Sequence, residues 1–170
     1  MTNTRLYREN VTIALALPEA FADWEAPTAA ELNGGLVFNI TCALNEDGTT
    51  FDLGDSDTDG SLSFCQAAGS VSPTFYNPSV TLEAFRSDDP TGADTANEAF
   101  GLLAFPDIEY FAVLRVIGEP DANFATGDRV SIVRVKTDYP VDTAGAGENI
   151  RISNSMLSQG DVNWNYEIAA

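Results

Sequence analysis

Residues 110–117, Tyr-Phe-Ala-Val-Leu-Arg-Val-Ile, are apolar on both faces of an extended chain. Because successive side chains of a strand point to opposite faces, this run predicts a central strand that is covered on both sides. The segments around it alternate between apolar and polar positions, which is typical of strands with one buried face. These further predicted strands are residues 11–17, 35–44, 51–53, 62–64, 80–85, 129–137 and 162–168.

Two short helices are predicted from capping boxes, in which a Thr and a Glu three residues later satisfy each other's backbone amides. One box runs from Thr28 to Glu31 and is followed at once by Asn-Gly-Gly; the other runs from Thr95 to Glu98 and is followed by an apolar stripe. The Gly-, Asp- and Thr-rich segments 45–50, 55–60, 87–94 and 138–148 are predicted loops. We therefore expect a single domain, residues 1–170, that is mainly β with one short-to-medium helix, arranged as a sandwich or barrel.

Charge and composition narrow the range of possible functions. The chain has eight Lys and Arg against 26 Asp and Glu, no His, and a net charge of −18. Without His there is no imidazole base, so no catalytic residue is predicted and a non-enzymatic role is favoured; a carboxylate pair such as Asp88 and Asp89 is the remaining catalytic alternative. The charge repels nucleic acid phosphate, and no apolar run approaches the ~20 residues that span a membrane.

An acidic motif, Asp-Ser-Asp-Thr-Asp-Gly at residues 55–60, matches the first half of a calcium loop. Gln66 stands where that loop needs a bidentate Glu, so we favour an acidic turn between strands and predict no metal site and no cofactor. The alternative is a secreted, calcium-stabilised β domain of a surface or adhesion protein. Two cysteines, Cys42 and Cys65, are predicted to be reduced thiols, at least one of them packed as a small apolar group. Residues 5–22 have only the outline of a secretory signal, and a half-buried strand over 11–17 is favoured.

Several segments, in order along the chain, carry a resemblance to a known family. They are residues 27–33, the strand 36–44, Phe-Asp-Leu-Gly-Asp-Ser-Asp-Thr at 51–58, 63–65, 81–86, 113–118, 127–130 and 133–140. Together they resemble the tail tube (major tail) proteins of long, non-contractile-tailed bacteriophages, particularly those of actinobacteria. The resemblance implies a sandwich-like subunit, hexameric rings whose inner sheets join into one barrel, and stacking of the rings into a hollow virion tube.

The resemblance also implies partners. These are further copies of the chain, and the phage tape measure, tail terminator and distal tail or baseplate proteins. Genomic DNA would pass through the lumen without specific binding, and no membrane would be involved; assembly would take place in the host cytoplasm. Another β-type virion protein, such as a capsid decoration or tail terminator protein, is the neighbouring alternative.

Lumen-facing residues should be polar or acidic positions on strands whose other face is apolar. The candidates are Asn39, Thr41, Asn163, Asn165 and Glu167. The alternative is that these faces form the tube exterior. The terminal segments and the loops 87–94 and 138–148 are hypothesised to make contacts between rings.

Overall fold

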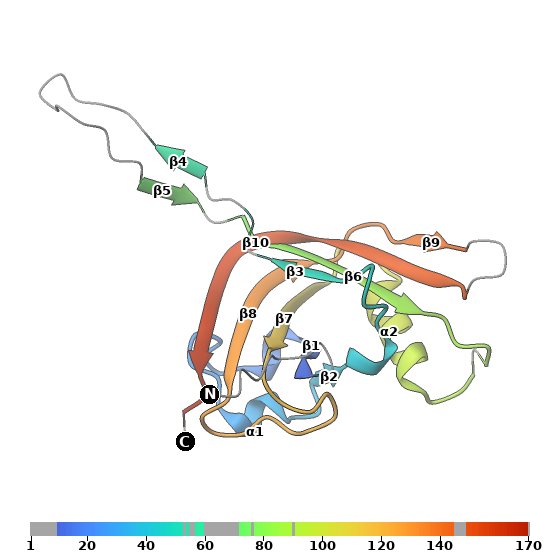
Figure 1. The fold of residues 1–170 in the computed structure, drawn as a ribbon, viewed down its shortest axis with the longest axis horizontal. Helices are drawn as coiled ribbons and strands as arrows, with labels where there is room; N and C mark the ends of the chain where they lie inside the picture. The colour runs from blue at the N-terminus through green and yellow to red at the C-terminus, as the bar shows by residue number, and fades with distance from the viewer. Residues whose placement is uncertain are drawn as a thin grey trace, which may run out of the picture.

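The computed structural model describes residues 10–52, 54, 57–59, 72–75, 77–89, 91–144 and 149–169, with the backbone alone for 57–59 and 72–75. The predicted fold class is confirmed, since the protein is mainly β with one helix longer than two turns (Figure 1). Among the described residues, no helix has the length and apolar character needed to cross a membrane.

One antiparallel sheet forms the body, with the strand order β2-β1-β7-β8-β10-β6-β3 and β9 beside β10. Its strands are β1 (Thr12–Ala16), β2 (Val37–Asn39), β3 (Thr50–Asp52), β6 (Ser79–Phe85), β7 (Glu109–Arg115), β8 (Arg129–Lys136), β9 (Val141–Thr143) and β10 (Arg151–Glu167). A separate two-stranded ribbon pairs β4 (Asp57–Asp59) with β5 (Ser72–Phe75). The helical segments are η2 (Pro18–Ala20), α1 (Ala29–Leu32), η3 (Thr41–Ala43) and α2 (Thr95–Leu103).

The sheet bends because β10 belongs to two layers. Residues 151–156 of β10 pair with β6, and residues 157–167 pair with β8. The pairing with β8 shifts register between Ser158 and Val162 and again between Asn163 and Tyr166, and Gly160 and Asn165 have positive φ of 86° and 57°. Such bulges bend a strand and increase its twist. Figure 1 shows the result, in which β10 arches from the layer of β6 and β3 down beside β8.

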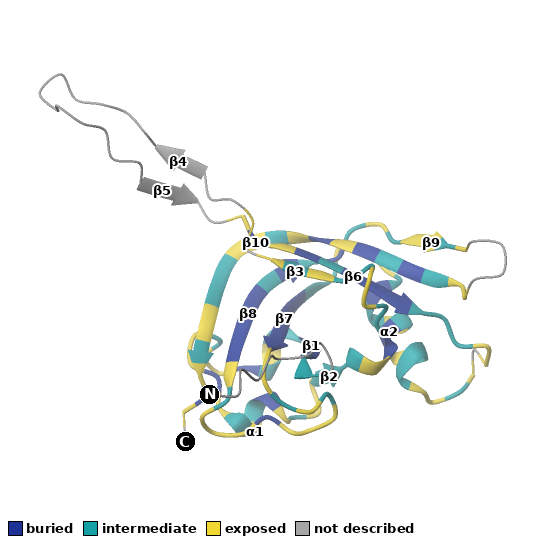
Figure 2. Ribbon diagram, in the orientation of Figure 1, coloured by how far each residue is buried: buried dark blue, intermediate teal, exposed yellow. Residues whose placement is uncertain are grey.

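Two apolar clusters lie on the two sides of the sheet. The first fills the concave side between the two layers, where α2 and η3 pack against residues such as Leu15, Leu82 and Val133. The second lies on the other face of β1, β7 and β8, where Phe21, Leu32 and Phe124 cover it. Strands β7 and β8 are therefore buried over most of their length, whereas the descending part of β10 is half-buried or exposed (Figure 2).

The first predicted capping box is confirmed and secures the cover over the second cluster. The Thr28 hydroxyl accepts from the Glu31 amide at 3.3 Å, and the Glu31 carboxylate accepts from the amides of Thr28 and Ala22 at 2.8 and 2.9 Å. The hydrogen bonds that the carboxylate accepts hold the pKa of Glu31 below its ordinary value; the bond from the Ala22 amide has the largest effect, followed by that from the Thr28 amide. The second box is shifted by one residue, because Asp94, not Thr95, caps α2 through the Asn97 amide.

The strand predictions are confirmed where burial is strongest. Strand β7 is central and covered on both faces, but it ends at Arg115, and Val116 and Ile117 of the predicted buried run 110–117 are 45% and 63% exposed. Strands β6 and β8 match the predicted segments 80–85 and 129–137. The strand predicted at 11–17 is present as β1, but the prediction that it is half-buried is wrong. All of β1 is buried, because the second cluster covers its other face. The long strand at 35–44 is also wrong; β2 holds three residues, and the chain then turns into η3.

Three further predictions need correction or fall outside the described residues. Residues 57–59 of the acidic motif form strand β4, so the turn prediction is wrong there. The predicted loop 138–148 contains strand β9. The predicted strand 62–64, Cys65 and Gln66 lie outside the described residues.

Arg115 organises the chain that follows β7. Its side chain is 2% exposed and donates to the carbonyls of Glu119, Ala122 and Asn123 at 2.8–3.0 Å, to the Thr12 hydroxyl at 2.9 Å, and to Asp128 at 3.0 Å. Gly118 has a φ of +144°, and a Cβ there would lie 2.9 Å from Arg115 Nε. The planar, multiply donating guanidinium thus holds residues 116–128 against the sheet.

We expect Arg115→Met to destabilise the fold by about 3 kcal/mol, because it leaves Asp128 and several carbonyls without their buried partner. The measurement is the free energy of unfolding in urea. The control is Arg129→Met, which removes an exposed pair with Glu167 and should cost less than about 1 kcal/mol. Equal losses in both variants would show that Arg115 has no special role.

Candidate assembly surfaces

Two of the five predicted lumen residues, Asn39 and Thr41, are engaged within the subunit. The Asn39 side-chain amide donates to the Pro120 carbonyl at 2.7 Å. The Thr41 hydroxyl lies 2.6 Å from Asn39 Oδ1 and accepts from the Ile13 amide at 2.8 Å. Both side chains therefore hold β2 and η3 against neighbouring segments. Their hydrogen bonds take over where the backbone pairing of β2 with β1 ends, at Asn39.

The other three predicted lumen residues lie on the descending part of β10. The Asn163 side-chain amide donates to the Glu25 carbonyl at 2.7 Å, and the Asn165 backbone amide donates to the Ser131 hydroxyl at 3.1 Å. The Glu167 carboxylate forms an ion pair with Arg129 at 3.0 Å.

The five residues do not share one face of the sheet. Asn39 stands opposite Ala14, and Asn163 opposite Ile132, and both of these partners belong to the second cluster. Glu167 stands opposite Arg129, whose neighbour Val130 points into that cluster, so Glu167 points to the other face. Asn39 and Asn163 can thus line one surface, and Glu167 lines another.

Unpaired sheet edges are the main feature that the sequence did not reveal. Beyond Met156, β10 pairs on one side with β8, and no other described strand lies along its second edge. Within the same described residues, β2 pairs only with β1, and β3 only with β6. Leu157 and Trp164 on β10 are 51% and 46% exposed, and Leu36 before β2 is also exposed. A long exposed edge with apolar side chains is a template for pairing with another chain.

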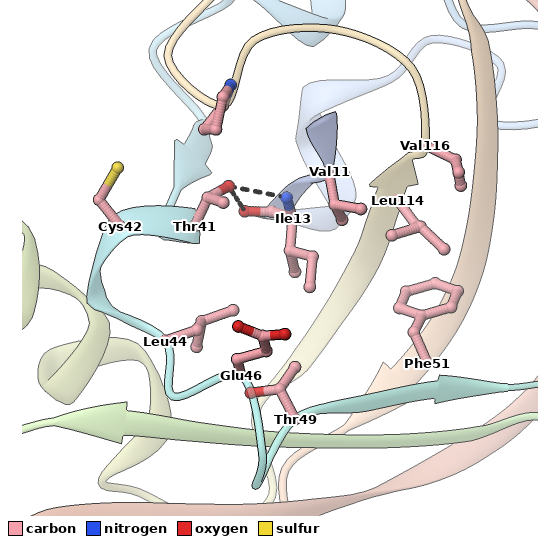
Figure 3. A pocket seen from close by; sticks show the side chains of 11 residues that line it. Val11, Ile13, Thr41, Cys42, Leu44, Glu46, Thr49, Phe51, Leu114 and Val116 are labelled. Atoms are coloured by element: carbon pink, nitrogen blue, oxygen red, sulfur yellow. Dashed lines mark hydrogen bonds between the residues drawn. The ribbon is translucent and has the colours of Figure 1, made fainter. Parts of the chain in front are cut away.

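An apolar groove of about 600 Å³ lies between β1, η3, β3 and the end of β7 (Figure 3). Its apolar lining consists of Val11, Ile13, Leu44, Phe51, Leu114, Val116 and Pro120, and its polar lining of Thr41, Cys42, Glu46 and Thr49. Figure 3 shows these side chains gathered around one space from elements far apart in the sequence.

Cys42 at this groove is exposed, whereas the predicted strand 35–44 would place it on the same face as the buried Ile40. The reason is the helical turn η3, which breaks the period of two. Cys42 Sγ donates to Asp121 Oδ1 at 3.2 Å. That hydrogen bond, together with partial burial, raises the pKa of the Cys42 thiol above its ordinary value.

Each Lys and Arg that the structure describes is within 3.6 Å of a carboxylate oxygen. The pairs are Arg86–Asp142, Arg115–Asp128, Arg129–Glu167, Arg134 with Glu109 and Asp161, Lys136–Asp107 and Arg151–Glu83. Because the described cations are engaged in this way, the acidic excess dominates the surface that the molecule presents.

Open sheet edges with exposed apolar side chains, on a strongly acidic β domain, are typical of a structural protein that associates with other chains. The chain belongs to the phage tail tube protein family, whose model matches residues 1–170, the whole chain. No curated protein matches the chain significantly. The predicted resemblance is thereby confirmed, and the protein is a structural component of the virion tail that assembles into a tube with other tail proteins. This membership favours the tail tube over the calcium-stabilised domain and the other virion proteins.

We expect Asp121→Asn to move the pH midpoint of Cys42 alkylation to a lower pH, because the variant removes the carboxylate that raises the thiol pKa. Peptide-resolved mass spectrometry of iodoacetamide labelling against pH measures this for Cys42 alone. Glu19→Gln changes the net charge equally at an exposed position on η2 and should leave the midpoint in place. An unchanged midpoint in Asp121→Asn would contradict the assigned contact.

Proposed function

We propose that six copies of this chain close into a ring, that rings stack into a hollow tail tube, and that genomic DNA leaves through the lumen without specific binding. The observation that carries the proposal is the pair of open edges at the two ends of the layer β2-β1-β7-β8-β10. We propose no catalytic role, which the structural family and the absence of His support.

Ring closure follows from joining unlike edges. If the free edge of residues 157–167 meets the β2 edge of the next copy, the layer continues from subunit to subunit. The contact is head-to-tail, so it generates a ring when the rotation between copies closes. Closure satisfies the backbone groups of both edges and covers Leu157, Trp164 and Leu36, which are exposed in the single subunit.

The lumen follows from the same layer. Asn39 and Asn163 lie on one face near its two ends, with the segments that cover the second apolar cluster between them, so ring closure would place both residues on the same surface of the tube. We propose this surface as the lumen lining, with the tube exterior as the alternative. The pairing of the described cations with carboxylates supports passage without binding, because phosphate contacts need available Lys and Arg.

Contacts beyond the ring are proposed at loops and ends. The loops 87–94 and 138–148 and the terminal segments are candidates for contacts between stacked rings, although Pro90 and residues 145–148 lie outside the described residues. The tape measure, tail terminator and distal tail or baseplate proteins are the proposed partners that set the length and ends of the tube.

The proposal is tested by negative-stain electron microscopy of the concentrated protein, wild type against Leu157→Lys. Wild-type protein should give hollow tubes of uniform width. A Lys on the free edge opposes strand pairing, so the variant should need at least about tenfold more protein for tubes, which corresponds to about 1.4 kcal/mol per contact.

The matched control is Ser155→Lys, which adds the same charge two residues earlier, where β10 is already paired with β6. It should assemble as wild type does. If Leu157→Lys forms tubes at the wild-type concentration, the free edge of β10 is not the ring contact. If no condition gives rings or tubes of wild-type protein, self-assembly without other tail proteins is wrong.

Moderate salt should promote tube formation. Each subunit carries a charge of −18, so assembly works against repulsion between like charges. Raising the ionic strength from about 0.01 to about 0.15 M shortens the screening length from about 30 to about 8 Å. Light scattering should therefore show a lower critical concentration at the higher salt. Slower or weaker assembly there would contradict a dominant role of charge repulsion.

A further inference from the structure

Exposed apolar side chains lie at both ends of the central strand β7. Phe105, four residues before β7 begins, is 62% exposed. Val116 and Ile117, directly after β7 ends, are 45% and 63% exposed. A strand of seven residues is about 23 Å long, at about 3.3 Å per residue. The two groups are therefore too far apart to form one patch, and each end of the strand presents its own apolar surface.

Tyr139 lies at the same end of the sheet as Phe105. Strands β7 and β8 are antiparallel, so the residues after β8 lie beside those before β7. The Thr137 hydroxyl donates to the Phe105 carbonyl at 2.8 Å, and the Asp107 amide donates to the Thr137 carbonyl at 2.8 Å. Tyr139, two residues further along, is 79% exposed. We call the surface formed by Phe105 and Tyr139 the aromatic end.

A buried side-chain amide fixes the backbone of the aromatic end. Asn154 is fully buried, and its side chain donates to the carbonyls of Leu103 at 3.0 Å and Asp138 at 2.8 Å. The Asn154 side chain also accepts from the Asp138 amide at 3.1 Å. Leu103 and Asp138 stand two residues and one residue before the two exposed aromatic side chains. A backbone that is ordered in advance lowers the entropic cost of a contact at this surface.

The other end of β7 adjoins the apolar groove. Figure 3 shows Leu114 and Val116 at the carboxyl end of the strand, beside the groove of about 600 Å³ that Pro120 also lines. The chain that follows is held by Arg115, which donates to the Glu119 carbonyl at 2.8 Å. We call the surface formed by Val116, Ile117 and the adjoining groove the hollow end. One subunit thus carries two unlike apolar surfaces at opposite ends of the same strand.

We propose that the aromatic end of one copy binds the hollow end of a copy in the adjacent ring, and that this contact stacks the rings. The inference rests on the proposed ring, in which the layer β2-β1-β7-β8-β10 continues from copy to copy through its edges. The ends of its strands then face the two neighbouring rings, with the tilt that a closed barrel requires. Because the two ends are unlike, the contact is head-to-tail and repeats without closing, as a filament requires.

The exposed area suits a contact between whole rings. An aromatic side chain has about 200 Å² of surface, so Phe105 and Tyr139 together expose on the order of 280 Å² in each copy. Six copies expose roughly 1,700 Å² on one face of a ring, whereas a standard interface buries about 800 Å² per partner. One copy alone therefore offers too little surface for a stable pair. Within a ring, each contact after the first is effectively intramolecular, so stacking of rings is favoured over pairing of single subunits.

Disulfide cross-linking between the unlike ends tests the proposal. Tyr139→Cys and Glu119→Cys are made in separate proteins, each with Cys42→Ser and Cys65→Ser; both positions are exposed, and Phe105, Val116 and Ile117 are kept. The two proteins are mixed, assembled and oxidised with diamide. Tubes of the mixture should give at least about tenfold more covalent dimers than tubes of either protein alone, because like ends do not meet in a head-to-tail contact. A mixture of Ser155→Cys with Glu119→Cys is the control for non-specific oxidation.

Removal of the aromatic side chains should separate stacking from ring closure. The double variant Phe105→Ser, Tyr139→Ser should still form rings in negative stain, but should need at least about tenfold more protein for tubes. Its urea midpoint of unfolding should stay that of wild type, because both side chains are exposed. The matched control is Ile150→Ser, which removes a 53% exposed apolar side chain that belongs to neither end and should assemble as wild type does.

Tubes without cross-links between positions 139 and 119 above the Ser155→Cys control would overturn the inference and leave the proposed tube intact. Tubes of the double serine variant at the wild-type concentration would do the same. Cross-links that are complete in isolated rings would assign the contact to neighbours within a ring and also overturn it. Absence of rings and tubes from wild-type protein would instead overturn the proposed assembly, and this inference with it.

Discussion

The fold depends on the continuity of β10 through its bend. A single backbone pairs with β6 over one part of its length and with β8 over the other, so the two layers are parts of one hydrogen-bonded sheet. Because the strand must rotate between these pairings, it needs the register shifts around Gly160 and Asn165. The concave space that results is filled by α2 and the first apolar cluster. The same bend leaves the second edge of the descending part without a strand partner among the described residues.

The sequence predicted an element of the fold correctly where the residues that determine the element are close together in the chain. Strand β7 was predictable because an uninterrupted apolar run needs no partner to be identified as buried. The Thr28 box was predictable because its two residues bond each other. The first part of β10 was missed although Ile152 and Met156 alternate with polar residues, because a bulge breaks the period before the better pattern at 162–168 begins. The burial of β1 on both faces depends on Phe21 and Leu32, whose covering role no local pattern shows.

The candidate surfaces were less predictable than the fold because they arise from pairings that are distant in sequence. The alternation rule grouped Asn39 and Asn163, which do share one sheet face, but the rule did not show that this face also carries the second apolar cluster. It could not show that Asn39 bonds Pro120, or that the bulge turns Glu167 to the other face. The groove likewise assembles Val11, Phe51 and Val116 from three strands or their ends, and Cys42 reaches it only because η3 interrupts the predicted strand. The net charge, in contrast, is a property of the composition, so a strongly acidic surface could be predicted from the sequence alone.

Charge and apolar edges act over different distances, and this separation explains how a strongly acidic subunit can still assemble. Repulsion between subunits extends over the screening length, about 8 Å at physiological salt. Apolar burial and strand pairing act only at contact, at about 25 cal/mol per Å² of buried apolar surface. An approach in the wrong orientation meets repulsion without the compensating contact, because Leu157, Trp164 and Leu36 lie along particular edges. The charge therefore disfavours disordered association, and the open edges select the one geometry in which attraction exceeds repulsion.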